Sequence, residues 1–477
     1  MKYPFFFLFL AILTNTYAQK PSVTFTSSDT ALQTAFNRAK EMALSYKGKL
    51  GDPVGPWYES SLPPRFAFCM RDVSHQSIAA EILGLSAENR NMTSLFVNNI
   101  SKSKDWCSYW EINKFGKPAA EDYRSDTAFW YNLNGNFDIL TACWKLYSWT
   151  GDKTYINNPA YLNFYQKSTK DFIDTWVLQA DSLLSRPSHP REQAGYNRKD
   201  AFHEYRGLPS YSEGVPHVKM GVDLVASIYR GLLSYSAMLR LNNQNEQAKT
   251  YEQKASRYQQ HIENEWWDPN TSLYNTHFTD EKTFGKGEGE TFLLWFDALK
   301  DSIRTEKTIA HLLSRDWNIE NLSYFPYQLY RYGYGKEANK YVLHLTNPAT
   351  ERREYPEVSF GVIQAIVQGL MGIEADAKSG AISTMYQGND KTGAKLNDLP
   401  ILGGTIDVEH QGAAKTTLKN TGTAPIAWNA KFAGRFDKLM LNGKMVNAGR
   451  ETSSEGIVYS YLKTRVMPGK NAVVSIR

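Results

Sequence analysis

Apolar residues recur at helical spacing in a long series of segments between residues 30 and 375. The first segment runs from Thr30 to Tyr46, and a proline-rich loop separates it from a second, more apolar segment that begins at Asp72. The same order of helix, loop and more apolar helix occurs six times. Two helices in each of six units predict a closed toroid of helical hairpins, in which the loops before the inner helices converge on one face.

The other five predicted hairpins follow in chain order. They pair 87–100 with 136–149, 155–180 with 217–241, 245–266 with 290–300, 301–313 with 324–332, and 336–345 with 359–373. Several of the connecting loops are long, and long loops within compact domains are usually functional. The repeat length varies from unit to unit, which distinguishes this chain from a regular helical solenoid.

After residue 376 the pattern changes to short β-type runs separated by Gly, Asn and Pro. These runs are 404–410, 414–420, 426–432, 438–441, 457–462 and 472–476. We therefore expect a mainly α protein, an (α/α)6 toroid over 19–376, followed by a small antiparallel β-sandwich over 377–477.

Residues 1–18 have the pattern of a secretory signal peptide. Lys2 precedes a short apolar core from Phe5 to Leu13, and small residues up to Ala18 predict cleavage before Gln19. The core is too short to span a bilayer after insertion, no Cys follows it for a lipid anchor, and no other apolar run has the length of a membrane span. The sequence thus predicts an exported protein, periplasmic or secreted.

Charge and cysteine content exclude several classes of function. The net charge of +5 is small and dispersed, which argues against a nucleic-acid partner and is compatible with a neutral or an anionic glycan. Three cysteines, Cys69, Cys107 and Cys143, cannot all pair, and their spacing fits no zinc site. We expect buried free thiols, no metal site and no cofactor.

The loops before the inner helices carry the candidate chemistry, since they are rich in carboxylates and aromatic residues. Glycoside hydrolysis generally uses two carboxyl groups on either side of the scissile bond. Arg71 and Asp72 precede the first inner helix, where Arg offers paired donors and Asp accepts from neighbouring sugar hydroxyls. His75 and Gln76 follow one turn later, and an Asp at this position is also a natural helix cap.

With this pattern the 30–375 stretch resembles the six-hairpin glycosidase superfamily, which includes glucoamylases, trehalases and α-rhamnosidases. The Arg71–Asp72 pair is similar to the glucoamylase motif that holds the sugar at the non-reducing end. In that family the general acid precedes the third inner helix and the general base precedes the sixth. The resemblance implies an inverting, exo-acting hydrolase with Glu213 or Glu204 as the acid and Glu357 or Glu354 as the base.

Neighbouring residues bear on these assignments. Arg206 would keep Glu204 ionised, which suits a base better than an acid. Arg352 and Arg353 flank Glu354 and would keep it charged, as a base requires, whereas Glu357 lies nearest the start of the inner helix. The sequence also offers further substrate-binding candidates and stacking platforms. These are Asp126, Tyr211, Glu288 and Glu290, with Trp57, Trp106, Trp110 and Trp130 as platforms.

Two other functions fit the same sequence. A polysaccharide lyase acting on a uronate would use a Tyr or His base with a cation, for which His203, Tyr205, Arg206 and His217 are candidates. A non-catalytic glycan-binding protein would use the aromatic loops for affinity alone. An unsaturated product that absorbs in the ultraviolet identifies a lyase, and binding without turnover identifies the binding protein.

Overall fold

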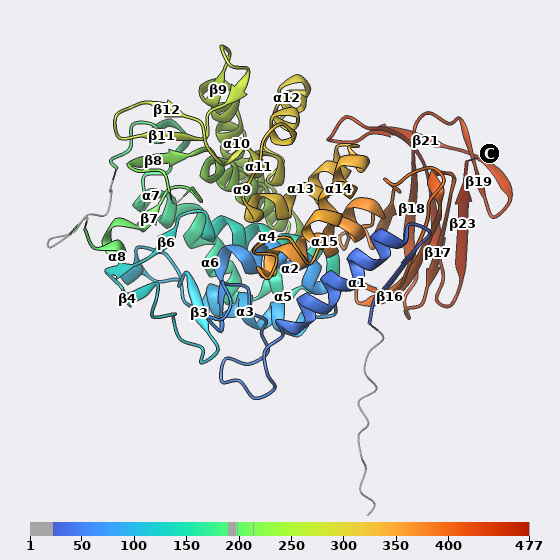
Figure 1. Ribbon diagram of the computed structural model, residues 1–477, viewed down its shortest axis with the longest axis horizontal. Coiled ribbons are helices and arrows are strands. Elements are labelled where there is room, and N and C mark those ends of the chain that lie inside the picture. Colours follow the sequence, from blue (N-terminus) through green and yellow to red (C-terminus); the bar gives the residue numbers. More distant parts are fainter. Residues whose placement is uncertain (1–21, 189–196, 198, 213, 477) are drawn as a thin grey trace, which may run out of the picture.

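The computed structural model describes residues 22–188, 197, 199–212 and 214–476. The predicted signal peptide and the candidate acid Glu213 lie outside the described residues. The described chain has a helical part and a β part, which lie side by side (Figure 1).

Six helices form a closed inner ring. Each contacts the next along the chain, and the last, α15, contacts the first, α2. The ring helices are α2 (Met70–Ile82), α4 (Gly135–Thr150), α9 (Val222–Leu241), α11 (Glu290–Trp295), α13 (Ile319–Arg331) and α15 (Pro356–Gln364).

Outer helices precede the ring helices in the chain, as the hairpin pattern predicts. They are α1 (Thr30–Ser45), α3 (Ser86–Asn98), α5 (Thr154–Asn157), α6 (Pro159–Lys167), α7 (Ile173–Thr175), α10 (Asn245–His261), α12 (Ser302–Leu313) and α14 (Gly335–Leu345). A further short helix, α8 (Ala201–Glu204), lies in the loop before α9. The inner helices are buried nearly all round, while the outer ones keep a polar face.

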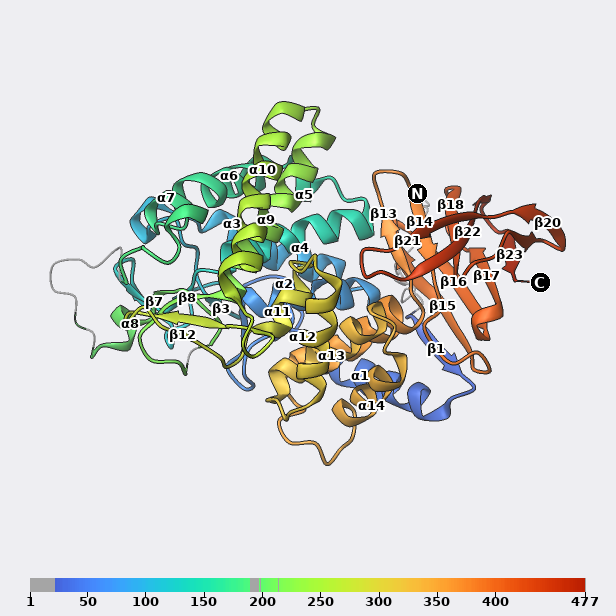
Figure 2. The same cartoon turned by 90° about the horizontal axis from the view of Figure 1, so that it is seen from above.

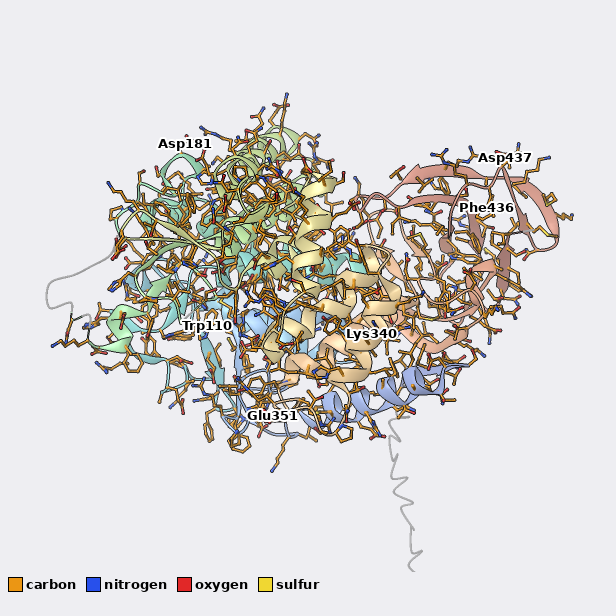
Figure 3. All side chains as sticks on the ribbon, turned by 45° about the horizontal axis from the view of Figure 1, so that its top comes forward. Trp110, Asp181, Lys340, Glu351, Phe436 and Asp437 are labelled. Atoms are coloured by element: carbon orange, nitrogen blue, oxygen red, sulfur yellow. The ribbon has the colours of Figure 1, made fainter. Side chains whose placement is uncertain are left out.

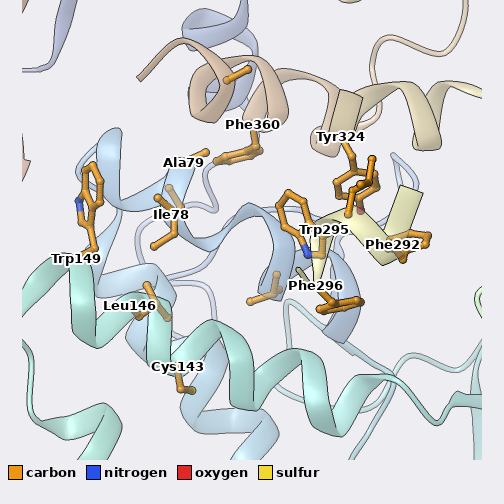
Figure 4. Close-up of a cluster of buried hydrophobic side chains, with 14 of the residues drawn as sticks. Ile78, Ala79, Cys143, Leu146, Trp149, Phe292, Trp295, Phe296, Tyr324 and Phe360 are labelled. Atoms are coloured by element: carbon orange, nitrogen blue, oxygen red, sulfur yellow. The ribbon is translucent and has the colours of Figure 1, made fainter. Parts of the chain in front are cut away.

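Aromatic and aliphatic side chains from the ring helices meet in the centre (Figure 4). Ile78 of α2, Leu146 of α4, Trp295 of α11, Tyr324 of α13 and Phe360 of α15 are all buried there. Burial of such side chains contributes about 25 cal/mol for each Å² of apolar area removed from water. Because these side chains come from five of the six ring helices, their packing helps to hold the ring closed.

The predicted helix boundaries differ from the structure mainly in the third hairpin. The segment 155–180 is not one helix, because Asn158 caps α6 and Pro159 occupies its first turn. The second helix of this hairpin begins at Val222 rather than at 217, because Val218–Gly221 forms strand β8.

The β part contains two large sheets that pack beside the helical part (Figure 2). The seven-stranded sheet has the order β1 (Thr24–Ser27), β15 (Gly393–Ile401), β16 (Gly404–Gln411), β17 (Lys415–Asn420), β23 (Asn471–Ser475), β19 (Lys438–Leu441) and β20 (Lys444–Asn447). The five-stranded sheet has the order β13 (Glu374–Asp376), β14 (Ala381–Thr384), β18 (Ile426–Ala433), β22 (Val458–Val466) and β21 (Gly449–Thr452).

Two features of the sheets were not predicted. Strand β1, from the N-terminal end of the described chain, pairs with β15 and so joins the C-terminal sheet. Strands β14 and β18 pair in parallel, whereas the other pairs of the two large sheets are antiparallel. The expected division of the chain at residue 376 stays a prediction.

Short strands in the loops complete the fold. They are β2 (Ala67–Cys69), β3 (Glu111–Asn113), β4 (Tyr123–Ser125), β5 (Ala128–Phe129), β6 (Tyr131–Asn132), β7 (Arg206–Leu208), β9 (Trp267–Asp268), β10 (Leu273–Tyr274), β11 (His277–Thr279) and β12 (Phe284–Gly285). The three cysteines are buried free thiols, which confirms that prediction. Within the described residues no helix is long and apolar enough to cross a membrane.

Candidate active site

An acidic residue occupies the first turn of every ring helix. These residues are Asp72, Asp138, Asp223, Glu290, Glu320 and Glu357. The N-terminus of a helix carries a partial positive charge, which stabilises a carboxylate in the first turn. The loops that lead into these helices therefore enclose an unusually acidic region at one end of the ring.

A pocket of about 700 Å³ lies in this region, and we call it the acidic pocket. Its walls carry six carboxyl groups and three guanidinium groups. They belong to Asp72, Glu111, Asp122, Glu288, Glu320 and Glu357, and to Arg65, Arg71 and Arg315.

The first cluster in the acidic pocket surrounds Arg71. Its Nε donates to Oδ1 of Asp72 at 3.2 Å, and its Nη2 lies 3.8 Å from Oε2 of Glu320. Glu357 is buried beside these acids, and burial, then the charges of Asp72 and Glu320, raise its pKa to about 8. Glu357 is therefore largely protonated at neutral pH, although it occupies the first turn of α15, where the helix favours the charged form.

The second cluster surrounds Arg65. Its Nη1 donates to Oε2 of Glu111 at 2.8 Å and lies 3.8 Å from Oδ2 of Asp122. Burial raises the pKa of both carboxyl groups, and the negative charge of Asp122 raises that of Glu111 further. Two buried carboxyl groups beside one cation favour a shared proton and one remaining negative charge.

Strand pairing places the second cluster next to the first. Strand β2 leads directly into α2, and Cys69 at its end pairs with Glu111 of β3. The backbone N–H of Trp130 donates to the carbonyl of Asp122 at 2.8 Å, which fixes the turn that carries this acid. The chain thus brings Glu111 and Asp122 to the start of the first ring helix from far along the loop.

Glu288 lines a further wall of the pocket. Its carboxylate accepts from the side-chain amides of Asn318 at 2.9 and 3.1 Å and of Asn321 at 3.1 Å. Asn318 is also the N-cap of α13. This network connects the loop before α11 to the start of α13.

Aromatic side chains supply the apolar surface of the pocket. The rings of Trp110 and Trp130 lie 4.9 Å apart at 61°, and Tyr211 lies beneath the guanidinium of Arg71 at 5.5 Å. Tyr211 is fixed at both ends, because its hydroxyl donates to Asp138 at 2.6 Å and its backbone N–H donates to Asp223 at 2.7 Å. The predicted platforms Trp57 and Trp106 do not line this pocket.

Seven of the candidate site residues singled out in the sequence do line the acidic pocket. They are Arg71, Asp72, Trp110, Trp130, Tyr211, Glu288 and Glu357. Ser212 and Gly214, the neighbours of Glu213 in the chain, also line it.

Two of the four candidate catalytic residues lie elsewhere. Glu204 is exposed at the end of α8, and Arg206 is paired with Asp105 instead of holding Glu204. Glu354 is exposed, and its backbone carbonyl accepts from the Tyr46 hydroxyl. Burial, which the sequence did not reveal, raises the pKa of Glu357 and favours its protonated form, which does not suit the base role that the resemblance implies for it.

The other candidate binding residues support the pocket from behind or lie outside it. The Nδ1 of His75 is 2.9 Å from the Tyr324 hydroxyl, and Gln76 is buried beside it. Glu290 is buried 3.6 Å from His311, and burial raises its pKa to about 7. Asp126 accepts from the Tyr123 hydroxyl at 2.5 Å and does not line the pocket.

Sequence reasoning missed Glu111, Glu320, Asp122 and Arg65. An acid in the first turn of each inner helix is a visible signal, and it would have identified Glu320. Glu111 has no comparable signal, because its place depends on the pairing of β2 with β3. Asp122 and Arg65 depend in the same way on how two long loops fold together.

No protein-family model matches this sequence, and no curated protein matches it either. Among solved structures, an α-L-rhamnosidase from Dictyoglumus thermophilum is similar over 96% of this chain, with a TM-score of 0.62 and 13% identity. A GH78 family rhamnosidase of Bacillus sp. GL1 is similar over 83% (TM-score 0.57, 11% identity), and a sialidase over 95% (TM-score 0.55, 10% identity).

The chain spans about half or less of each of these proteins, namely 50%, 40% and 41% of their lengths. At this level of identity the likeness concerns the fold alone. The closed ring of paired helices and these structural matches indicate the same fold. The protein has the six-hairpin glycosidase fold.

Proposed function

We propose that this protein is an exported glycoside hydrolase whose active site is the acidic pocket. The observation that carries the proposal is the place of Glu357, a buried carboxyl group that lines a pocket with aromatic walls, where burial and the charges of Asp72 and Glu320 raise its pKa. General acid catalysis needs such a group, because the proton must still be present at neutral pH. The signal-peptide pattern of residues 1–18 supports export.

In the proposed reaction Glu357 donates its proton to the glycosidic oxygen as the bond to the anomeric carbon breaks. A water molecule forms the new bond at that carbon, and its proton passes to a carboxylate that acts as base. The Glu111–Asp122 pair, with one negative charge held by Arg65, is our candidate for this base. Attack by water from the opposite side inverts the anomeric configuration.

This assignment makes Glu357 the general acid, whereas the family resemblance implies that it is the general base. In a base, the carboxyl group must be ionised before the reaction, whereas burial beside Asp72 and Glu320 favours the protonated form. Glu213 remains a candidate for the complementary role, since its chain neighbours line the pocket. Arg71 and Asp72 are then the proposed clamp for the hydroxyl groups of the terminal sugar.

The charge of the pocket favours a neutral sugar over a uronate. With Glu357 protonated and one proton shared by Glu111 and Asp122, four negative charges face three guanidinium groups, so an anionic substrate would meet net repulsion. The four residues that the sequence offered for a lyase, His203, Tyr205, Arg206 and His217, are also not among those that line the pocket. Arg206 pairs with Asp105, and His217 is exposed. We therefore favour hydrolysis of a neutral oligosaccharide over elimination from a uronate.

The domain arrangement proposed here is a six-hairpin catalytic toroid over 19–376 with a β-sandwich over 377–477. Arg331 of α13 pairs with Glu455, which lies between β21 and β22, and β1 joins the N-terminal segment to the seven-stranded sheet. These contacts support a stabilising role for the β-sandwich.

The test is release of reducing ends from a panel of neutral and uronate-containing oligosaccharides. We expect new reducing ends from a neutral substrate, without ultraviolet absorbance, and one anomer of the product in the first NMR spectra. Glu351 is an exposed glutamate in the loop before α15 (Figure 3). Glu351→Gln is the matched control for Glu357→Gln and should keep full activity. An unsaturated product would indicate a lyase, and saturable sugar binding without turnover would indicate a binding protein.

Removal of one aromatic wall should weaken binding more than catalysis. Trp130→Ala is expected to raise KM about tenfold and to change kcat less than about threefold, because an aromatic contact contributes about 0.5–1.5 kcal/mol. Steady-state kinetics on the best substrate of the panel measures both constants. Trp57→Phe, a change at a buried tryptophan outside the pocket, should leave KM unchanged.

A further inference from the structure

A second cavity, of about 220 Å³, lies at the opposite end of the ring helices from the acidic pocket. Residues from all six ring helices, or from the segments that directly follow them, line its walls. Most of these residues lie in the C-terminal parts of the helices, and the residue from α9 lies in the middle of that helix. At about 30 Å³ for each water molecule, its volume equals that of about seven waters. We call it the basic cavity.

Three cations face this cavity. They are Lys145 of α4, Arg230 of α9 and Arg331 of α13. The carboxylates among the lining residues are Asp297, which follows α11, and the exposed Glu374 of β13. Asp297 lies 2.8 Å from Nη2 of Arg331 and 3.3 Å from Nη1 of Arg230, and Arg331 also pairs with Glu455.

Of the three cations, Lys145 is the one that pairs with none of these carboxylates among the described residues. Its Nζ lies 4.4 Å from the centre of the Trp295 ring, and among the described residues it forms no ion pair. Burial, then the charge of Arg230, lowers its pKa to about 7; Asp297 and Asp138 oppose this shift, and Arg331 adds to it. Burial disfavours a charge of either sign, but Arg230 and Arg331 on the same walls provide positive charge that attracts an anion towards Lys145.

The remaining walls suit a small ring. Trp144, Trp149, Trp295 and Tyr327 provide apolar faces, while Ser148 and Gln368 provide polar groups. Arg331 is the last residue of α13, where a cation compensates the helix dipole, and both Arg331 and Arg230 pair with Asp297. Neither arrangement provides a carboxylate partner for the ammonium of Lys145.

We propose that the basic cavity binds a small organic anion, a single-ring molecule that carries one carboxylate or phosphate group, with Lys145 as its principal ion-pair partner. This site is separate from the acidic pocket, and the proposal does not depend on the hydrolase activity.

The test is isothermal titration calorimetry of the full mature chain with glucuronate, glucose 6-phosphate, inorganic phosphate and glucose. At pH 6 we expect saturable binding of at least one of the two ring anions and no binding of glucose. Binding of glucuronate alone or of glucose 6-phosphate alone decides between carboxylate and phosphate, and binding of inorganic phosphate shows that the ring is not needed. Because the bound anion favours the charged lysine, affinity should fall about tenfold or more between pH 6 and pH 9.

Two variants locate the site. Lys145→Met should weaken binding at least tenfold and remove most of its dependence on pH, and Arg230→Gln should weaken binding while the pH dependence stays. Arg71→Met in the acidic pocket should leave the affinity unchanged. Near-ultraviolet circular dichroism confirms that each variant is folded. Absence of saturable binding of both ring anions at pH 6, or binding that Lys145→Met and Arg230→Gln both leave unaltered, would overturn the proposal.

Discussion

Glu357→Gln is expected to lower kcat about 10³-fold, since a positioned acid contributes roughly 10²–10⁴-fold to such reactions. Glutamine keeps the shape of the side chain but has no proton to transfer to the glycosidic oxygen. KM should change little, because the surrounding clamp of Arg71 and Asp72 is intact. Steady-state kinetics beside Glu351→Gln measures the effect, and a loss of less than tenfold would remove Glu357 from the reaction.

The pH dependence of the wild type provides a second view of the same group. If Glu357 is the acid, activity should fall as pH rises through about 8, where the group loses its proton. A substrate with a good leaving group needs less protonation, so it should restore much of the activity of Glu357→Gln. A base role would give the opposite limb, with activity rising through the same pH.

The same substitution should change stability in a direction fixed by linkage. The pKa of Glu357 is about 8 in the folded protein, against 4.5 as its ordinary value. Between these values the folded state holds a proton that the unfolded state has released, so the protein loses stability as pH rises. Glu357→Gln should therefore be more stable than the wild type at pH 8, by a few kcal/mol at most, and nearly equal at pH 4. Urea denaturation at both pH values measures the difference.

Much of the helical ring could be predicted because its pattern is local. The apolar spacing of the inner helices is visible within each segment, and an acid lies in the first turn of each, so Asp72 and Glu357 could be placed at the right end of the ring. The break at Asn158 and Pro159 was also visible in the sequence, but the prediction ran one helix across it.

The rest of the site depends on contacts between distant segments. Glu111 reaches the pocket through its pairing opposite Cys69, and β1 reaches the C-terminal sheet through β15. Periodicity in one segment carries no information on such partners. The pKa of Glu357 is unpredictable for the same reason, because it depends on burial and on Glu320 of another helix, which outweigh the nearby arginines of its own loop.

The second large effect is expected at Asp297, the carboxylate that pairs with Arg230 and Arg331 in the basic cavity. Burial would raise its pKa, but Arg331 and Arg230 outweigh burial and hold it at about 2. Asp297 is 24% exposed, and Arg331 is 17% exposed. Loss of one partner from such a partly buried network leaves charges uncompensated, which costs about 3–5 kcal/mol in buried pairs.

Asp297→Asn is the least disruptive way to remove this charge. The residue has a φ of 52°, in the left-handed region that asparagine also tolerates, so the backbone need not change. We expect the variant to lose about 3 kcal/mol of unfolding free energy at pH 7, at the lower end of the range because the site is partly exposed. The pKa is depressed from 3.8, so this contribution is present above about pH 4 and disappears as pH falls towards 2.

Asp437→Asn is the matched control for this experiment. Asp437 pairs with Arg450 at the edge of the β part (Figure 3), where its side chain is 90% exposed, and such pairs contribute about 0–1 kcal/mol. Urea denaturation of both variants at pH 7 compares the two ion pairs directly. Equal losses in the two variants would show that the network at Asp297 stabilises the protein no more than a surface pair does. A loss confined to Asp297→Asn would instead show that Asp297 stabilises the fold. The two arginines that pair with it would then destabilise the protein once their counter-charge is removed.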